Sequence, residues 1–368
     1  MKLWMRAAGA LKDQRSILLV SLSPRSAYRN PDLEAAIIKA TNHNDSSIDY
    51  RNAQRVFAWI RASPVSMKPL IRALCCRMEK TQSWVVALKG LMLMHGIFCC
   101  KTPAVRRIGR LPFDLSHFND GHSKTSKTWG FNAFIRSYYT FLDQRSTLLY
   151  FQRKQTEDTM VQEIVKLQKL QTLLDMLLRI SPQATNMRES LILEAMDCVI
   201  LEIFDVYSRI CNSITKVLLG IYSAGKLEAR MALEVLQKAV IQGEDLARHF
   251  EFCREFGVFN AMEVPTITQI PEEDITDLER IINGVPDKTQ VNYDYVDDSK
   301  AIMVRENSSA IVEDKTPNRL KTIITDKWEV FYEERSEIYD YRTGNPPNSS
   351  LLPFLPVYKR ELPDLISF

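Results

Sequence analysis

Two adjacent cysteine pairs and one histidine are the residues most obviously capable of metal chemistry. Cys75–Cys76, Cys99–Cys100 and His95 carry zinc-binding side chains. Neighbouring residues on a helix point about 100° apart, so both thiols of a pair cannot face one ion unless the helix unwinds. No CxxC spacing occurs among the seven cysteines. We therefore expect no metal and no other cofactor, and reduced thiols that pack as small apolar groups.

Catalytic constellations are also missing from the sequence. It contains no GxGxxG, no GxxxxGK[ST], no nucleophile elbow and no HExxH. Glu194, Asp197, Glu202 and Asp205 recur at helical spacing, and a row of charges on a long helix usually faces solvent. The sequence therefore predicts a protein that is not an enzyme.

Basic residues are the remaining groups that could bind a ligand. The formal net charge is +3, but residues 286–368 hold 11 Lys and Arg against 15 Asp and Glu, which leaves +7 for residues 1–285. A basic body indicates an anionic partner, either a membrane surface or a nucleic acid. The sequence pI of about 8.4 is below the strongly basic range typical of nucleic-acid binding, so no nucleic-acid partner is expected.

Helical periodicity runs through the body that carries these charges. Capping residues, prolines and apolar spacing predict an all-α chain with helices from Asn30-Pro31-Asp32 onward and at 51–62, 69–79, 84–100, 132–152, 161–180, 190–219 and 227–256. No strand alternation is visible, and consecutive helices with short breaks indicate an α-solenoid or a long bundle. The helix expected at 84–100 is apolar nearly all round, but Lys89 and His95 interrupt it, so we interpret it as a buried central helix of a soluble protein.

The two ends of the chain differ from this body. Residues 1–19 form a basic amphipathic segment in which Lys12 and Arg15 lie beside a broad apolar face. Its periodicity fits equally well an interfacial membrane helix and a helix packed on the solenoid. Residues 286–368 are polar, acidic and broken by prolines, which predicts a flexible tail that ends in a linear motif.

Five segments in order resemble a known family. They are IKATNH at 38–43, SWVVALK at 83–89, FNAFIRSYYTFL at 131–142, VYSRIC at 206–211 and HFEFCR at 249–254. Together they are similar to the ANTH/ENTH-domain family of plant-type clathrin assembly proteins, over roughly residues 10–285. The resemblance implies a right-handed helical solenoid at about 20–285, with an ENTH-like part at about 25–155 and a tail after it.

The same resemblance implies function and partners. It implies a clathrin assembly protein and endocytic adaptor that is cytoplasmic and peripheral to the membrane, at clathrin-coated pits and vesicles or at Golgi and trans-Golgi membranes. The expected partners are phosphatidylinositol 4,5-bisphosphate or other anionic lipids, clathrin, vesicle SNAREs and adaptor complexes.

The expected phosphoinositide site departs from the family pattern. That pattern is a Lys, a second Lys after nine further residues, and then, after one residue, a Lys or Arg followed by a His or Tyr. Lys39 and Arg51 match it, whereas Asp49 and Asn52 stand at the other two positions. A phosphorylated inositol needs several cationic contacts, and Asp49 would repel it. The candidate contacts are therefore Lys39, Arg51 and Asn52, with His43, Lys12 and Arg15 in support.

The tail offers one weak docking motif. Asp364, Leu365 and Ile366 faintly resemble a short clathrin-binding sequence, while the repeated tripeptides that relatives use for adaptors are missing. The degenerate lipid site leaves an alternative open, namely a cargo- or protein-binding helical scaffold that has lost tight phosphatidylinositol 4,5-bisphosphate binding. A helical scaffold for an unrelated protein is the third possibility.

Overall fold

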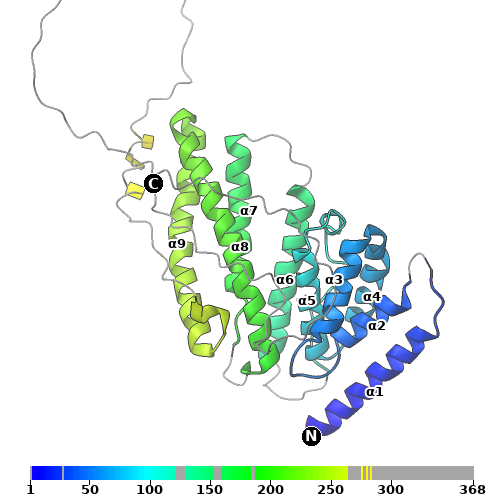
Figure 1. The fold of residues 1–368 in the computed structure, drawn as a ribbon. Helices are drawn as coiled ribbons and strands as arrows, with labels where there is room; N and C mark the ends of the chain where they lie inside the picture. The colour runs from blue at the N-terminus through cyan, green and yellow to red at the C-terminus, as the bar shows by residue number, and fades with distance from the viewer. Residues whose placement is uncertain are drawn as a thin grey trace, which may run out of the picture.

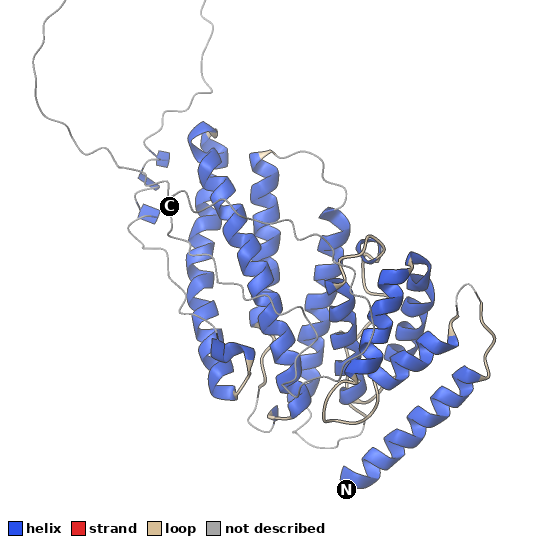
Figure 2. Cartoon of the chain, viewed as in Figure 1, coloured by secondary structure: helices blue, strands red, loops and turns tan. Residues whose placement is uncertain are grey.

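The computed structural model describes residues 2–26, 29–121, 129–152, 159–183 and 187–263, with helical fragments at 275–276, 279–280 and 282–283. Within these residues the chain is helical, and the isolated bridge between Ser26 and Arg29 is the only extended pairing (Figure 2). The predicted all-α fold is confirmed. The predicted tail lies outside the described residues.

The described helices run in the order of the chain (Figure 1). They are α1 (Lys2–Ser21), α2 (Pro31–Ala40), α3 (Tyr50–Ala62), α4 (Met67–Lys80), α5 (Trp84–Cys99), α6 (Trp129–Gln152), α7 (Met160–Leu178), α8 (Ser190–Gly220) and α9 (Lys226–Phe256), with short 3-10 turns η1 (Pro64–Ser66), η2 (Val105–Arg107), η5 (Ile221–Ser223) and η6 (Asn260–Glu263). The predicted boundaries differ by at most three residues for the helices from α5 onward. The predicted domain boundary at residue 19 falls inside α1.

Local signals explain where the first helices begin. Pro31 opens α2, and the Asn30 side chain accepts hydrogen bonds from the backbone N–H groups of Asp32 and Leu33 at 3.1 and 3.3 Å. Asp49 caps α3 in the same way, because its Oδ1 accepts from the Asn52 N–H at 3.1 Å. Both caps satisfy backbone donors that have no partner inside the helix.

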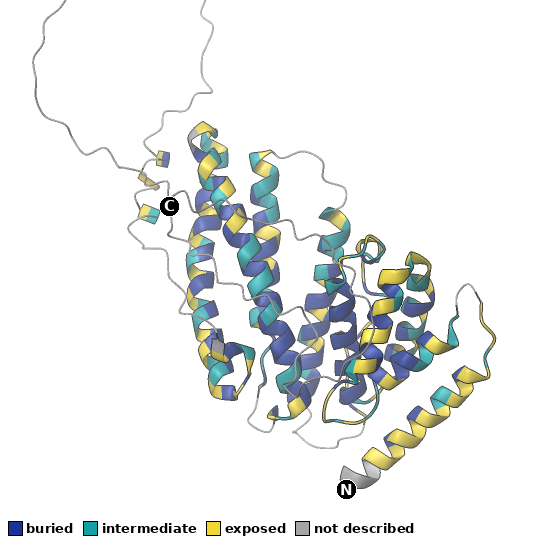
Figure 3. Cartoon of the chain, viewed as in Figure 1, coloured by how far each residue is buried: buried dark blue, intermediate teal, exposed yellow. Residues whose placement is uncertain are grey.

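The core centres on α5 and α8 (Figure 3). Every residue of α5 from Val85 to Phe98 is buried, as expected for a helix covered on all sides. α8 packs against α5, α7 and α9. No described helix combines the length and apolar character needed to cross a bilayer.

The carboxylates of α8 correct one expectation. Glu202 and Asp197 are buried and Glu194 is partly buried, so these three do not face solvent, whereas the Asp205 side chain is 36% exposed. The physical reason is that α8 is central, and each carboxylate has a specific partner there. Arg145 and His95 bind Glu202, and the Asn260 N–H donates to Asp197 Oδ1 at 2.8 Å.

Candidate functional site: a basic pocket beneath the first helix

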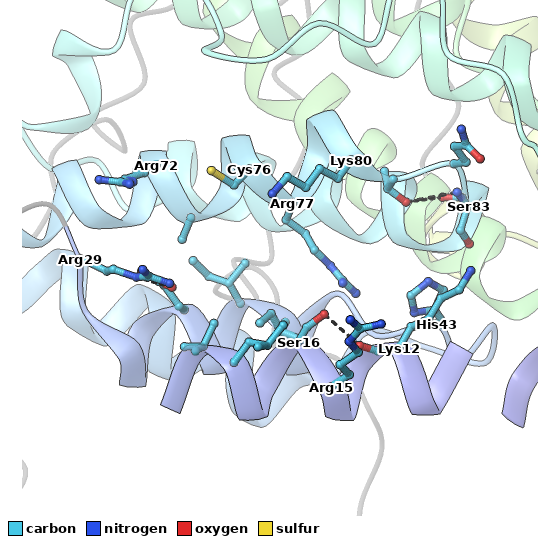
Figure 4. A pocket seen from close by; sticks show the side chains of 18 residues that line it. Lys12, Arg15, Ser16, Arg29, His43, Arg72, Cys76, Arg77, Lys80 and Ser83 are labelled. Atoms are coloured by element: carbon cyan, nitrogen blue, oxygen red, sulfur yellow. Dashed lines mark hydrogen bonds and ion pairs between the residues drawn. The ribbon is translucent and has the colours of Figure 1, made fainter. Parts of the chain in front are cut away.

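A cavity of about 700 Å³ lies between α1, α2 and α4. Its lining is rich in basic side chains, namely Lys12, Arg15, Arg29, His43, Arg72, Arg77 and Lys80. Figure 4 shows Lys12 and Arg15 on α1 facing α4, which carries Arg72, Arg77 and Lys80. Glu34 is the one acidic residue in the lining, and it pairs with Arg29 at 3.1 Å. The pocket therefore has the charge to hold a multivalent anion.

Asp13 holds α1 against the rest of the molecule. This carboxylate is 7% exposed and accepts a hydrogen bond from Arg77 Nη2 at 2.7 Å. Its other oxygen accepts from the His43 backbone N–H at 2.9 Å and lies 2.9 Å from His43 Nδ1. Burial alone would raise the pKa of Asp13, but the hydrogen bonds from His43 and Arg77 outweigh it and hold the pKa below its usual value. Asp13 is therefore a charged anchor at neutral pH.

Two further contacts complete the docked face of α1. Gly9 lies so close to the loop after α2 that an added Cβ would stand 2.5 Å from the His43 Cβ, so only glycine fits there. Arg6 Nη2 lies 2.6 Å from Asp45 Oδ1. Gly9 and Asp13 are four residues apart and lie on the same face of the helix.

The opposite face of α1 is apolar and exposed. Leu11 and Leu18 of α1 and Leu22 directly after its end, which we call the leucine row, are 66%, 64% and 83% exposed. At about 100° per residue they share one stripe, roughly 180° from Gly9 and Asp13. The sequence left open whether this segment packs on the solenoid or meets a membrane. In the structure one face packs, and the other presents leucines to solvent.

Four pocket cations lack a carboxylate partner within the described part of the chain. Arg77 is committed to Asp13 and to the Thr41 carbonyl oxygen, the latter at 2.8 Å. The four cations Lys12, Arg15, Arg72 and Lys80 are exposed and enter no ion pair among the described residues. Lys12 and Arg15 stand on α1 between Leu11 and Leu18, so charge and apolar surface adjoin along this helix.

The structure brings together only part of the predicted site. Lys12, Arg15 and His43 line the pocket, whereas Lys39, Arg51 and Asn52 do not.

Lys39 and Arg51 are exposed, and Asn52 is buried and donates from Nδ2 to Asp49 Oδ2 at 2.7 Å. Asp49 and Asn52 therefore serve the start of α3, which explains why neither position holds a cation.

Sequence reasoning missed four pocket residues: Arg29, Arg72, Arg77 and Lys80. A signal was available on α4, where Leu70, Leu74 and Met78 form the buried stripe. Arg72 and Lys80 are eight residues apart and so share the exposed side of α4. Nothing local to α4 indicates that α1 lies opposite.

A second cluster of candidate ligands lies in the core. His95, Cys99 and Glu202 place one potential metal-binding atom each within 4.8 Å of one another. However, Arg145 binds both oxygens of Glu202, and His95 Nδ1 lies 2.7 Å from the Tyr138 hydroxyl. The candidate ligand atoms of His95 and Glu202 are therefore already committed to a hydrogen-bonded network, so the geometry does not favour an ion there.

Comparisons with known proteins show the family of this chain. The family model described as the ANTH domain matches residues 32–284. The chain belongs to the ANTH domain family. Two Arabidopsis thaliana proteins, each named "Putative clathrin assembly protein", are 50% and 47% identical to it, over 100% of this chain and 100% of theirs. A third of the same name and organism is 42% identical over 79% of this chain and 84% of its own.

The family match begins at the start of α2. In this ANTH protein α1 lies outside the matched residues, although it supplies Lys12 and Arg15 to the pocket. The pocket is thus formed jointly by the ANTH core and by the helix that precedes it.

Proposed function

We propose that this ANTH protein is a non-enzymatic adaptor that attaches to anionic, phosphoinositide-containing membranes and links them to clathrin and vesicle cargo. The observation that carries the proposal is the basic pocket, in which four cations enter no ion pair among the described residues, together with the leucine row that adjoins Lys12 and Arg15. The names of its relatives support the clathrin part.

Electrostatics and apolar burial act together in this arrangement. Each basic residue near an anionic surface contributes about 1 kcal/mol of attraction. A leucine moved from water into the acyl boundary contributes about 1.5–3 kcal/mol. With α1 lying on the membrane, the leucine row enters the bilayer surface, and the adjoining pocket receives a phosphorylated headgroup.

Vesicle co-sedimentation of the full chain tests this proposal. Vesicles containing phosphatidylinositol 4,5-bisphosphate are compared with phosphatidylserine vesicles of equal charge, at low and physiological salt. We expect preferential binding to the former. Replacing Lys12 and Lys80 by alanine should weaken binding about fivefold per cation. A Leu18→Ser, Leu22→Ser double variant should weaken it on both lipids.

Two further double variants complete the experiment. Lys39→Ala with Arg51→Ala tests whether the segment that matches the family pattern also contributes to vesicle binding. Lys169→Ala with Arg230→Ala removes two exposed cations of α7 and α9 and serves as the charge-matched control. Equal losses of vesicle affinity in the control and the pocket variant would mean that the protein binds by general electrostatic attraction and not through the pocket. No binding to either lipid would overturn the proposal.

The clathrin link requires its own measurement. Pull-down of the clathrin terminal domain with the full chain should succeed, and replacing Asp364, Leu365 and Ile366 by alanine should reduce it. Those three residues lie outside the described part of the chain. The location proposed with this role is the cytoplasmic face of coated pits and vesicles, with Golgi membranes as a further site and SNAREs or adaptor complexes as further partners.

One observation favours the alternative function. Asp49 caps α3 and accepts from the Asn52 side chain, so the segment that matches the family's lipid pattern retains only Lys39 and Arg51 as cations. A chain that binds clathrin but neither lipid would be a cargo- or protein-binding scaffold that has lost tight phosphoinositide binding.

A further inference from the structure

Lys89 is a fully buried cation in the middle of α5. Its side chain has no exposed surface. A buried ammonium group is costly unless hydrogen bonds satisfy it. Here Nζ donates to Asn42 Oδ1 at 2.8 Å and to the Asn44 carbonyl oxygen at 2.5 Å. Both partners belong to the loop that connects α2 to α3, so the cation of the core helix holds this loop from inside.

The two contacts of Lys89 determine the path of the loop. Asn42 is the hub, because its Oδ1 also accepts from the Asn44 N–H at 3.1 Å and its Nδ2 donates to the Lys39 carbonyl oxygen at 2.9 Å. The loop is attached again near its far end, where the Ile48 N–H donates to Glu194 Oε2 at 3.2 Å. Between these attachments the loop presents a defined surface to α1.

That surface is the seat of α1. His43 lies between Asn42 and Asn44, and its backbone N–H and Nδ1 both meet Asp13. Gly9 packs on the His43 side chain, and Asp45 pairs with Arg6. A shift of the loop would therefore move the docking contacts of α1 and, with them, one wall of the basic pocket.

Lys89 remains charged at neutral pH despite its burial. Burial lowers its pKa to about 8, while the carboxylates of Glu194, Asp13, Asp45 and Asp49 oppose the decrease. These carboxylates come from α8, from α1 and from the loop itself. Asp13 and Asp45 are also the two carboxylates that dock α1, so the buried cation attracts the docking contacts themselves.

We propose that Lys89 is a positioning residue for membrane attachment: from inside the core it holds residues 42–44 in place and thereby seats α1 over the basic pocket. This inference rests on the proposed attachment to anionic membranes. Lys89 contacts neither the lipid nor α1. By fixing the loop, it nevertheless determines how α1 docks and how the pocket is presented to the lipid.

Hydrogen–deuterium exchange of the full chain tests the positioning role without any lipid. Lys89→Met removes the ammonium group and leaves Asn42 Oδ1 and the Asn44 carbonyl with one donor fewer each. We expect residues 2–21 and 41–49 to exchange about tenfold faster in this variant, since charge-assisted hydrogen bonds contribute about that factor. Lys89→Gln retains an amide donor one bond shorter and should recover part of the protection.

A matched control separates positioning from general instability. Leu91 is also fully buried in α5 and points about 200° away from Lys89. Leu91→Ala creates a cavity and lowers the melting temperature, but it should leave exchange at 2–21 and 41–49 in step with the rest of the chain. If Lys89→Met fails to fold, Asn42→Ala provides the second variant. It removes the hub, while the ammonium group of Lys89 keeps its hydrogen bond to the Asn44 carbonyl oxygen.

Binding to vesicles containing phosphatidylinositol 4,5-bisphosphate completes the test. Lys89→Met and Asn42→Ala should each lose about tenfold in affinity, whereas Leu91→Ala should bind like the wild type below its melting temperature. Unchanged exchange of α1 in both variants would overturn the inference even if the wild type binds vesicles. Faster exchange of α1 in a protein that binds no vesicles would overturn the proposed function and leave the docking role of Lys89 standing.

Discussion

Asp13 of α1 and Arg77 of α4 are 64 positions apart in the chain, yet Arg77 Nη2 donates to Asp13 Oδ1 over 2.7 Å. Their side chains are only 10% and 14% exposed. This pair connects the first helix to the ANTH core, and it places a carboxylate against Arg77, one of the basic residues that line the pocket. Arg77 is therefore engaged in docking α1, and we expect the other pocket cations to bind an anionic ligand.

A double-mutant cycle on this pair should show strong coupling. Asp13→Asn, Arg77→Met and the combined variant, compared by urea denaturation, should give a coupling free energy of about 1–3 kcal/mol, as expected for a partly buried charged hydrogen bond. The exposed pair of Arg6 and Asp45 provides the control, where about 0–1 kcal/mol is expected. Coupling no larger than in the control pair would contradict the role of Asp13 as the anchor.

The buried ion pair of Glu202 should be costly to break. Arg145 binds both of its oxygens, and although burial alone would raise the pKa of Glu202, Arg145 and His95 hold it at about 2. Glu202→Gln leaves the Arg145 guanidinium buried without its counter-charge and should lower the free energy of unfolding by about 3–5 kcal/mol. Asp205→Asn, one turn further along α8, is partly exposed and should change it by under about 1 kcal/mol. Equal effects of the two substitutions would mean that Glu202 is not held as an ion.

His249 should make the protein less stable in mild acid. Burial lowers its pKa from 6.5 to about 4, and a hydrogen bond to the Leu178 backbone opposes this only in part. Between these values the unfolded chain binds a proton that the folded chain does not, so the free energy of unfolding falls as the pH drops from about 6.5 to 4. The full loss is on the order of 3 kcal/mol. His249→Gln should flatten the stability profile in that window when denaturation is followed by circular dichroism, and an unchanged slope would contradict the assignment.

Two glycines of the last long helix should respond in opposite directions to alanine. Gly243 lies inside α9, and an added Cβ would meet no atom within 4 Å, so Gly243→Ala should stabilise the protein by about 0.5–1 kcal/mol. Gly257 ends α9 with φ +89°, a conformation that costs an L-residue about 1–2 kcal/mol. Thermal denaturation of the two variants checks both signs, and a stabilising Gly257→Ala would contradict the left-handed cap.

The helices could be predicted from the sequence because their signals are local. Apolar spacing in α5 and α8 and the caps at Asn30 and Asp49 act within one or two turns of the helix. The misjudged carboxylates of α8 show the limit of this approach. Their spacing is the same whether Glu202 faces water or Arg145, and only the position of α8 at the centre of the packing decides between the two.

By itself, the sequence determined that this chain is helical and basic in its body, because composition and short-range periodicity can be read directly from the residues. Its five ordered segments also showed the resemblance to the ANTH family. The tertiary structure decided which cations stand together. Lys12 and Arg15 meet Arg72 and Lys80 only because Asp13 and Gly9 dock α1 on the loop that Lys89 holds. Contacts between residues so far apart depend on how helices pack against one another, and no local pattern records that packing.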